Sequence, residues 1–359
     1  AALAFAFSLF AKETAVSLLL IAPVVLIFSE IRISGKTWMH VVGALIVVTA
    51  FYFYSRFAVL GSLSPGKRDL VTFPFLFIGN DWDRLGTSFL VVAKSIWLTF
   101  FPYPLISDYS YNQIPHYSFR DWQSYASFFL IIALGIFGLR AFLRKQPIGF
   151  GLLILLLPLS IPFVYSFHFG FSMAERLLFV PSIGAAILLA SLCLRVPRQL
   201  RGITLICVVG GLAYLTVSRN LDWRDNLTLF RADMVHSEDN ARAHFVLARE
   251  LRESMRKVSD SKVKEQILDE SIFHLRRSIE IYPDYAFPLM EIGAAYAMKG
   301  DYLAAREALG RAIAILPELE DAHYFLGALD ATEGKLDQAA INLSRALELD
   351  SKNERTMLI

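Results

Sequence analysis

The sequence predicts an all-α protein in two parts, a bundle of membrane-spanning helices followed by a solenoid of paired helices. Residues 1–218 alternate long apolar runs with short charged loops, whereas the chain after Arg219 is polar and repeats its pattern every 34 residues. The charge changes at the same place, with 16 Lys and Arg against 8 Asp and Glu before residue 219 and 19 against 25 after it. A basic, apolar part is therefore joined to an acidic, helical part, and the net charge of +2 conceals this division.

The apolar part holds seven segments that we expect to cross a membrane. The chain is 55% hydrophobic, which is too apolar for a water-soluble protein of this length, and a bilayer core needs about 20 apolar residues per helix. The predicted spans are the end of one at 1–11 and then 14–29, 38–55, 122–139, 148–165, 177–194 and 202–218. Lys94 interrupts a further apolar run at 86–101, where we expect a re-entrant or interfacial helix.

The basic loops predict which face of the membrane each segment reaches. Lys and Arg gather in three short loops: Arg32 with Lys36; Arg140, Arg144 and Lys145; and Arg195, Arg198 and Arg201. Short loops of this kind stay in the cytoplasm. All three loops can lie in the cytoplasm only if 56–121 is one large loop on the outer face. The last span then places everything after Arg219 on the non-cytoplasmic face as well. That face is the periplasm for a bacterial inner membrane, the lumen of the endoplasmic reticulum, or the cell exterior. Because the basic residues lie at span ends, we expect no nucleic-acid partner.

The soluble part repeats every 34 residues. Pairs of identical residues recur at this spacing: Pro283 and Pro317, Gly293 and Gly327, Gly300 and Gly334, Ala305 and Ala339, Leu309 and Leu343, and Ala312 and Ala346. This helical period is typical of tetratricopeptide (TPR) repeats. The small residues at 293, 305 and 312 would let the two helices of a repeat approach closely. An earlier repeat begins near Ala241, with its second helix from about Glu270 after an insertion around 257–265, and Asp330 weakens the third repeat because it replaces Tyr296.

The predicted domains are a membrane domain at 1–218, a junction at 219–240, an array of about three repeats at 241–352, and a tail at 353–359. TPR arrays bind extended peptides on the face formed by their first helices, so we expect a protein or peptide partner there. The candidate residues for this groove are Arg242, Phe245, Phe287, Met290, Asp321 and Tyr324. The alternative is that some of these side chains simply pack against the next repeat.

Three polar sites on the predicted outer face could bind an anionic ligand. Lys12 and Glu13 lie between two apolar spans, Glu175 and Arg176 lie where a span begins, and Asp108 lies in the outer loop among tyrosines. Arginine is the preferred planar partner for phosphate. The alternatives are ion pairs that mark the membrane boundary and an aromatic belt at the interface, formed by Tyr103, Tyr109, Tyr111, Tyr117 and Trp122. The histidines and cysteines show no ligand spacing, so we expect no metal.

Four segments together resemble the transmembrane and tetratricopeptide-repeat (TMTC) protein O-mannosyltransferases and their bacterial relatives. They are FAKETAV around Lys12, FPYPLISDYSYNQIP around Asp108, MAERLLFVPSIG around Arg176, and RNLDWRDNLTLFRADMVHSEDNARAHFVLA from Arg219. The four segments occur in the same order as in the family, and together they extend over nearly the whole chain.

The resemblance implies a GT-C glycosyltransferase fold for the membrane domain. Such enzymes transfer a sugar, here most simply mannose, from a polyprenyl-phosphate donor to a Ser or Thr hydroxyl of a protein on the non-cytoplasmic face. Lys12 and Arg176 would then bind the donor phosphate, with Glu13, Glu175 and Asp108 in support. The resemblance also implies that the acidic general base lies upstream of Ala1, so this sequence is expected to be an inactive fragment.

Two other functions remain open from the sequence. One is a polymerase or ligase of lipid-linked oligosaccharides that has the same fold and a TPR tail. The other is a membrane-anchored TPR scaffold without enzymatic activity, although a scaffold would need only one span.

Overall fold

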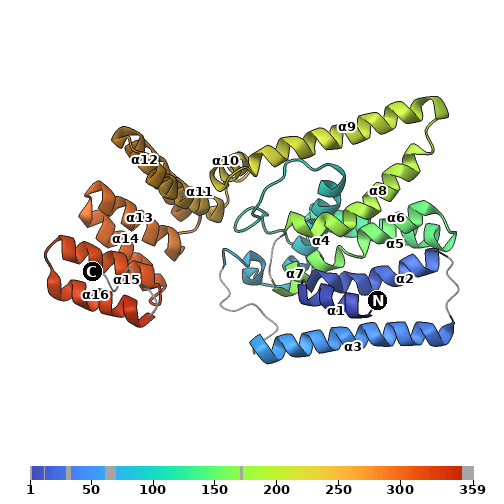
Figure 1. The fold of residues 1–359 in the computed structure, drawn as a ribbon, viewed down its shortest axis with the longest axis horizontal. Helices are drawn as coiled ribbons and strands as arrows, with labels where there is room; N and C mark the ends of the chain where they lie inside the picture. Colours follow the sequence, from blue (N-terminus) through green and yellow to red (C-terminus); the bar gives the residue numbers. More distant parts are fainter. Residues whose placement is uncertain (1, 12, 30–33, 61–69, 170–172, 350–359) are drawn as a thin grey trace. The chain divides into compact units, whose positions relative to one another are not determined.

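The chain folds into helices that form two compact units. The computed structural model describes residues 2–11, 13–29, 34–60, 70–169 and 173–349, and these residues form α-helices and short 3-10 helices without β-strands (Figure 1). The first unit comprises residues 1–109 and 114–221, and the second comprises 110–113 and 222–359. The predicted all-α class is confirmed, with an apolar bundle and a repeat array as its two parts.

The first unit contains nine α-helices in its described residues. Its α-helices are α1 (Ala2–Ala11), α2 (Leu18–Phe28), α3 (Gly35–Leu60), α4 (Asp81–Phe100), α5 (Trp122–Leu143), α6 (Pro147–Leu156), α7 (Ser160–Phe169), α8 (Phe179–Cys193) and α9 (Arg198–Asp222). Its 3-10 helices are η1 (Glu13–Ser17), η2 (Pro74–Phe77) and η3 (Glu175–Leu178). The helices α4, α5, α6, α7 and α8 pack against one another around a shared core.

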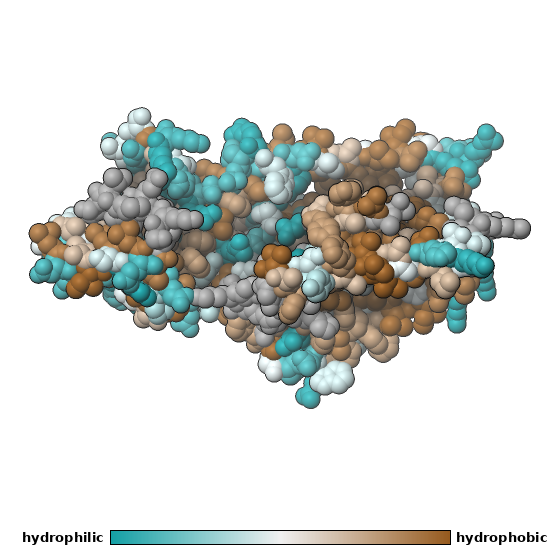
Figure 2. Space-filling model, turned by 60° about the horizontal axis from the view of Figure 1, so that its bottom comes forward, coloured by the Kyte–Doolittle hydropathy of each residue, from teal (hydrophilic) through white to brown (hydrophobic). Residues whose placement is uncertain are grey.

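Five helical stretches of the described residues are long and apolar enough to cross a membrane. They are Gly35–Val59, Trp122–Leu143, Pro147–Val164, Glu175–Cys193 and Arg198–Asp222, with a shorter apolar helix at Ala15–Phe28. Their outer surfaces are apolar, and large side chains such as Phe51, Phe129 and Ile206 are exposed. Figure 2 shows such apolar side chains in brown over much of one face of the molecule. An exposed apolar surface of this extent is stable in lipid and not in water, so the protein is an integral membrane protein.

The helix α4, which includes the apolar run 86–101, is not one of these five stretches. One face of α4 is buried and includes the hydroxyl side chains of Thr87, Ser88 and Ser95. The Thr87 hydroxyl donates to the Tyr117 carbonyl oxygen at 3.0 Å and accepts from the Tyr117 amide at 3.1 Å. This helix therefore anchors the loop that follows it.

The second unit is an array of antiparallel helix pairs. After α10 (Asn226–Met234), the pairs are α11 (Ala241–Ser254) with α12 (Ser261–Ile281), α13 (Ala286–Lys299) with α14 (Tyr302–Ile315), and α15 (Glu320–Thr332) with α16 (Leu336–Leu349). Consecutive helices pack together along the chain (Figure 1). Gly300 and Gly334, 34 residues apart, take φ values of +80° and +76°, and glycine adopts this left-handed conformation without steric cost.

Two details of the array bear on the sequence interpretation. A Cβ added at Gly293 would lie 2.7 Å from Leu309 Cγ, so the glycine does permit close approach of α13 and α14. The second helix of the first repeat begins at Ser261, well before the expected Glu270. The Asp260 side chain caps it, accepting from the Lys262 amide at 2.8 Å, so the inserted residues from Ser261 onward lengthen this helix, while those before it form a short connection.

Four residues of the loop between α4 and α5 belong to the second unit. The Tyr111 carbonyl accepts from the Ala241 amide at 2.8 Å, and the Asn112 amide donates to the Asp239 carbonyl at 3.2 Å. The Tyr111 ring also packs against Tyr282, with centroids 5.7 Å apart. The segment 110–113 is therefore bonded to the start of the first repeat by backbone and side chain.

Candidate functional site

Arg176 is an exposed arginine at the beginning of an apolar helical stretch. It lies in η3, directly before α8, and its side chain makes no salt bridge with any described residue. A guanidinium without a carboxylate partner in this part of the chain can bind an external anion, and its planar fork matches phosphate oxygens.

Arg176 lines a cavity of about 270 Å³ in the first unit. The lining residues come from η1, α7, the α6–α7 connection, η3 and the start of α8; they are Ser17, Pro158, Ile161, Arg176, Leu177, Phe179 and Val180. Arg176 is the single charged side chain in this set, and most of the others are apolar. A cavity with one cation and apolar walls suits an amphiphile that has an anionic head and a hydrocarbon chain.

Close packing of α8 on α6 determines where this cavity forms. A Cβ added at Gly184 would lie 2.3 Å from the Leu155 backbone nitrogen and 2.6 Å from the Gly151 carbonyl oxygen. No side chain fits at this distance, so the glycine of the PSIG sequence is what allows α8 to contact the α6 backbone. The contact brings the end of α6, with Pro158 just beyond it, to the beginning of α8 where Arg176 lies.

Glu175 points its carboxylate toward the loop after α4. Its Oε1 accepts from the Ile106 amide at 2.7 Å and from the Tyr109 hydroxyl at 2.8 Å. Tyr109 is only 3% exposed, so it is not part of an interfacial belt, unlike the exposed Tyr103 and Trp122. Glu175 therefore fastens this loop to the beginning of the Arg176 segment.

Lys94 joins the same group of residues, a contact that its position as an interruption of the apolar run does not predict. Its ammonium lies 5.1 Å from the centroid of the Tyr109 ring and interacts electrostatically with Glu175. A lysine within an apolar helix is itself a signal of a functional or pairing role, but only the fold shows which residues it meets. Asp108 is half-buried in this loop and does not line the Arg176 cavity.

Lys12 and Glu13 are the other residues expected to bind the donor or to support its binding. Lys12 lies outside the described residues, and so does the side chain of Glu13. The 3-10 helix η1, which begins at Glu13, contributes the buried Ser17 to the Arg176 cavity. Among the described residues no group of three or more His, Cys, Asp or Glu could hold a metal ion.

The six groove residues of the array divide into buried and accessible side chains. Phe245 and Met290 are 8% and 4% exposed, which agrees with the alternative that some of these side chains pack against the neighbouring repeat. Phe245 packs against Tyr285 and Phe287, with ring centroids 5.5 and 6.2 Å apart, and Met290 belongs to the core between the second and third repeats. The accessible residues are Arg242, Phe287, Asp321 and Tyr324.

The same helices contain an ion pair that the sequence did not indicate. Arg252 on α11 lies 2.8 Å from the carboxylate of Glu291 on α13. Burial raises the pKa of Glu291, and the charge of Arg252 opposes that rise. The pair links the first helices of two repeats.

Several curated relatives of this chain are protein O-mannosyl-transferases. Human protein O-mannosyl-transferase TMTC1 is 28% identical over 225 residues, which cover 58% of this chain and 24% of the relative. Human protein O-mannosyl-transferase TMTC3 is 23% identical over 310 residues, which cover 84% of this chain and 30% of the relative. The chain is TMTC-like. It spans about a quarter of the length of the curated relatives it matches.

No protein-family model matches the chain. Among solved structures, it is similar to TTC0263, a TPR protein of Thermus thermophilus, with a TM-score of 0.35 and 16% identity over 64% of this chain and 95% of that one. It is also similar to MamA, with a TM-score of 0.29 and 20% identity over 48% of this chain and 94% of that one.

Proposed function

We propose that the chain acts in a membrane glycosyltransferase that moves a sugar, mannose in the simplest case, from a polyprenyl-phosphate donor to a Ser or Thr hydroxyl of a protein. The observation that supports this most is the Arg176 cavity, where a single guanidinium stands against apolar walls. The similarity to protein O-mannosyl-transferases supports the reaction class.

In this proposal Arg176 stabilises the leaving group. The acceptor hydroxyl attacks the anomeric carbon of the sugar while the bond from that carbon to the phosphate oxygen breaks. The hydroxyl proton passes to a carboxylate base, and the lipid phosphate leaves with an added negative charge. A guanidinium that meets this charge as it develops lowers the barrier. Glu175 keeps Arg176 in place through the loop residues Ile106 and Tyr109, and Lys12 would add a second cation.

The array would bind the protein acceptor or a partner protein through Arg242, Phe287, Asp321 and Tyr324. For the acceptor to meet the donor, the array and Arg176 must face the same side of the membrane. The basic loops support the non-cytoplasmic side for both, since Arg195, Arg198 and Arg201 precede the last span.

The experiment compares Arg176→Lys and Arg176→Ala with the unchanged protein after purification in detergent. It measures photo-crosslinking of a polyprenyl-phosphate probe and turnover of the donor lipid in the full-length protein. We expect both variants to lose most activity, by about 100–1,000-fold, because one charged transition-state donor is worth that much and Lys lacks the planar fork.

A matched control is Arg198→Lys, which changes an exposed arginine at the beginning of α9 outside the cavity. A membrane anchor would tolerate Lys at position 176, because Lys extends its charge to the interface as well as Arg does. Turnover and crosslinking of Arg176→Lys equal to those of Arg198→Lys would refute the assignment of Arg176 to the donor phosphate.

A further inference from the structure

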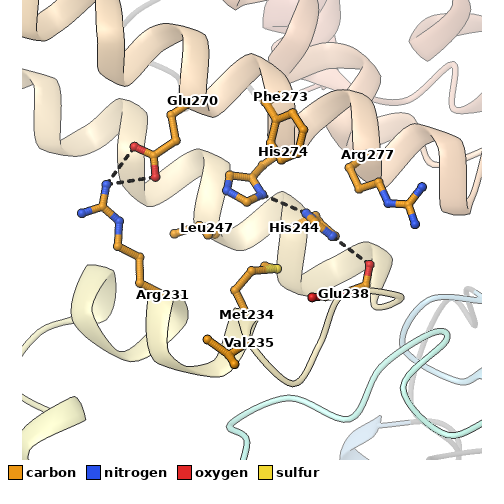
Figure 3. Close-up of a pocket in the computed structure, with 10 residues that line it drawn as sticks. All are labelled: Arg231, Met234, Val235, Glu238, His244, Leu247, Glu270, Phe273, His274 and Arg277. Carbon is orange, nitrogen blue, oxygen red and sulfur yellow. Dashed lines mark hydrogen bonds and ion pairs between the residues drawn. The ribbon is translucent and has the colours of Figure 1, made fainter.

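A pair of buried histidines joins the two helices of the first repeat. His244 on α11 and His274 on α12 are 4% and 9% exposed, and their Nδ1 atoms lie 2.9 Å apart. The Nε2 of His244 lies 3.0 Å from the backbone carbonyl oxygen of Glu238. Figure 3 shows the two rings in line, with this carbonyl at the end of the row.

The hydrogen bonds determine which nitrogens hold the protons. Burial lowers the pKa of both rings, that of His274 to about 4, so both are neutral at pH 7. A carbonyl oxygen can only accept, so His244 Nε2 holds a proton and His244 Nδ1 does not. His274 Nδ1 must then donate to His244 Nδ1. The remaining nitrogen, His274 Nε2, is left with a lone pair and no hydrogen-bond donor among the described residues.

The histidine pair lines a cavity of about 460 Å³ between α10, α11 and α12. Its apolar lining residues are Met234, Val235, Leu247 and Phe273. Val235 and Phe273 are 70% and 62% exposed, so much apolar surface here is open to a ligand. A ligand that covers it gains the burial of that surface.

The two arginines of the cavity already have carboxylate partners. The Nη2 of Arg231 donates to both carboxylate oxygens of Glu270, at 2.8 and 3.0 Å, and Arg277 pairs with Glu280 at 3.1 Å. An anionic ligand would have to displace a carboxylate, which disfavours it. The guanidinium planes remain able to contact the face of an aromatic ring, which needs no counter-charge.

This cavity is distinct from the predicted peptide groove. On an α-helix, successive residues are turned by about 100°, so His244 and Leu247 lie on a different face of α11 from Arg242 and Phe245. The cavity therefore offers the array a second binding surface in the first repeat.

We propose that this cavity binds a tryptophan side chain of a partner protein. The indole supplies a large apolar body for the exposed Val235 and Phe273 and one N–H for His274 Nε2. Indole has a donor and no acceptor, so no lone pair is left unsatisfied when it is buried, as it would be for a phenol. The inference depends on the second unit alone and is independent of the donor site at Arg176.

The test uses the purified full chain and a fluorinated N-acetyl-tryptophan amide as probe, followed by fluorine NMR. The second probe is the same molecule methylated on the indole nitrogen, which keeps the shape and removes the donor. We expect the N–H probe to bind with a dissociation constant of about 1 mM and the methylated probe to bind about fivefold more weakly, because one buried hydrogen bond is worth about 1 kcal/mol.

Two variants locate the binding. Phe273→Ala removes an exposed wall of the cavity, whose ring packs edge-on against His274 with centroids 5.2 Å apart, and should weaken the N–H probe several-fold. His274→Phe removes the acceptor and should make the two probes bind equally, whereas the control His323→Phe, in the third repeat, should leave the difference intact. Equal binding of both probes to the unchanged chain, no binding of the N–H probe, or binding unaffected by Phe273→Ala would overturn the proposal.

Discussion

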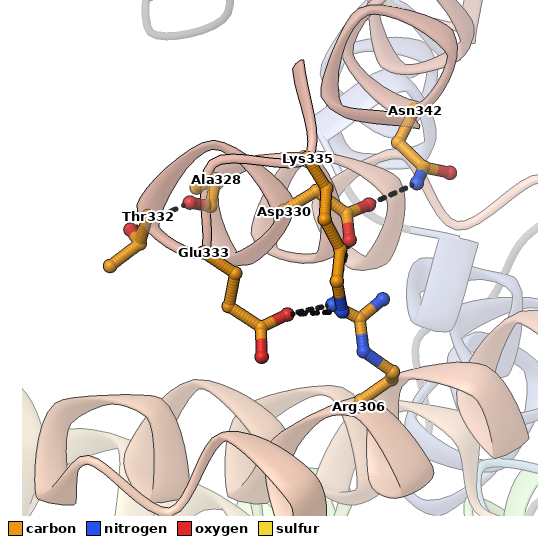
Figure 4. A network of polar contacts seen from close by, with 7 residues as sticks. All are labelled: Arg306, Ala328, Asp330, Thr332, Glu333, Lys335 and Asn342. Carbon is orange, nitrogen blue, oxygen red and sulfur yellow. Dashed lines mark hydrogen bonds and ion pairs between the residues drawn. The ribbon is translucent and has the colours of Figure 1, made fainter. Parts of the chain in front are cut away.

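A buried carboxylate in the third repeat offers the sharpest test of how the array is held together. Asp330 on α15 is fully buried. One of its oxygens lies 2.7 Å from the guanidinium of Arg306 on α14, and the other accepts from the Asn342 side chain on α16 at 2.8 Å. Arg306 also contacts Glu333, as Figure 4 shows, and about a third of its side chain is exposed.

Removing Asp330 and removing Arg306 should lower the stability of the array by different amounts. Asp330→Ala leaves a partly solvated guanidinium that keeps Glu333, so we expect a loss of about 1–3 kcal/mol. Arg306→Ala leaves a fully buried carboxylate with only the Asn342 amide. Breaking a buried pair in this way costs about 3–5 kcal/mol. Removing both partners should cost less than Arg306→Ala alone, because no uncompensated charge remains.

Hydrogen exchange of the full chain in detergent measures these costs as opening free energies of α14, α15 and α16. Arg345→Ala is the matched control, since it removes an exposed arginine whose partner Glu348 lies one turn away on the same helix, and such pairs contribute about 0.5 kcal/mol or less. A larger loss for Asp330→Ala than for Arg306→Ala would refute the reasoning.

Three further predictions concern the array and its side of the membrane. Gly293→Leu should destabilise the second repeat by roughly 1–3 kcal/mol, because Leu309 Cγ would lie 2.7 Å from the new Cβ; unchanged protease resistance of the repeat would show that its helices are not in this register. The first repeat should be fully stable above about pH 6.5 and lose stability as the pH falls toward 4, because the pKa of His274 is about 4 in the folded state and its ordinary value is higher; the loss in the opening free energies of α11 and α12 should be on the order of 3 kcal/mol, and it should be smaller in His274→Phe, which keeps only the lowered pKa of His244. A reporter active only in the cytoplasm, fused after Ile359, should be silent, and a bright signal would reverse the proposed sidedness.

Features with a local or periodic signal could be predicted from the sequence. The apolar spans and the 34-residue period are of this kind, because hydrophobicity and small residues at fixed spacing record which surfaces are buried. The pairing of Tyr109 with Glu175 could not be predicted, since 66 residues separate them and nothing local marks a tyrosine as buried.

Asp330 shows the same limit within the array. At the equivalent position of the preceding repeat, the Tyr296 hydroxyl accepts from Arg276 on the helix before it. Asp330 makes the corresponding contact with Arg306. Asp330, which departs from the repeat pattern, therefore replaces a hydrogen bond between tyrosine and arginine with an ion pair between aspartate and arginine. Its partner Arg306 lies in the preceding repeat. The burial of Phe245 and Met290 could not be predicted either, because helical spacing shows which face of a helix a residue lies on but not how far the neighbouring repeat covers that face.

The segment 110–113 makes the array discontinuous in sequence. A fragment cut at Asp222 would retain all the repeat helices described here, yet it would lack the short piece whose Tyr111 carbonyl accepts from the Ala241 amide and whose ring covers Tyr282. Excising, swapping or transplanting the array by its linear boundaries would thus remove part of its own first repeat. An engineered array would need these four residues grafted back, and during synthesis the segment 110–113 must wait for the first repeat, which is made well after it.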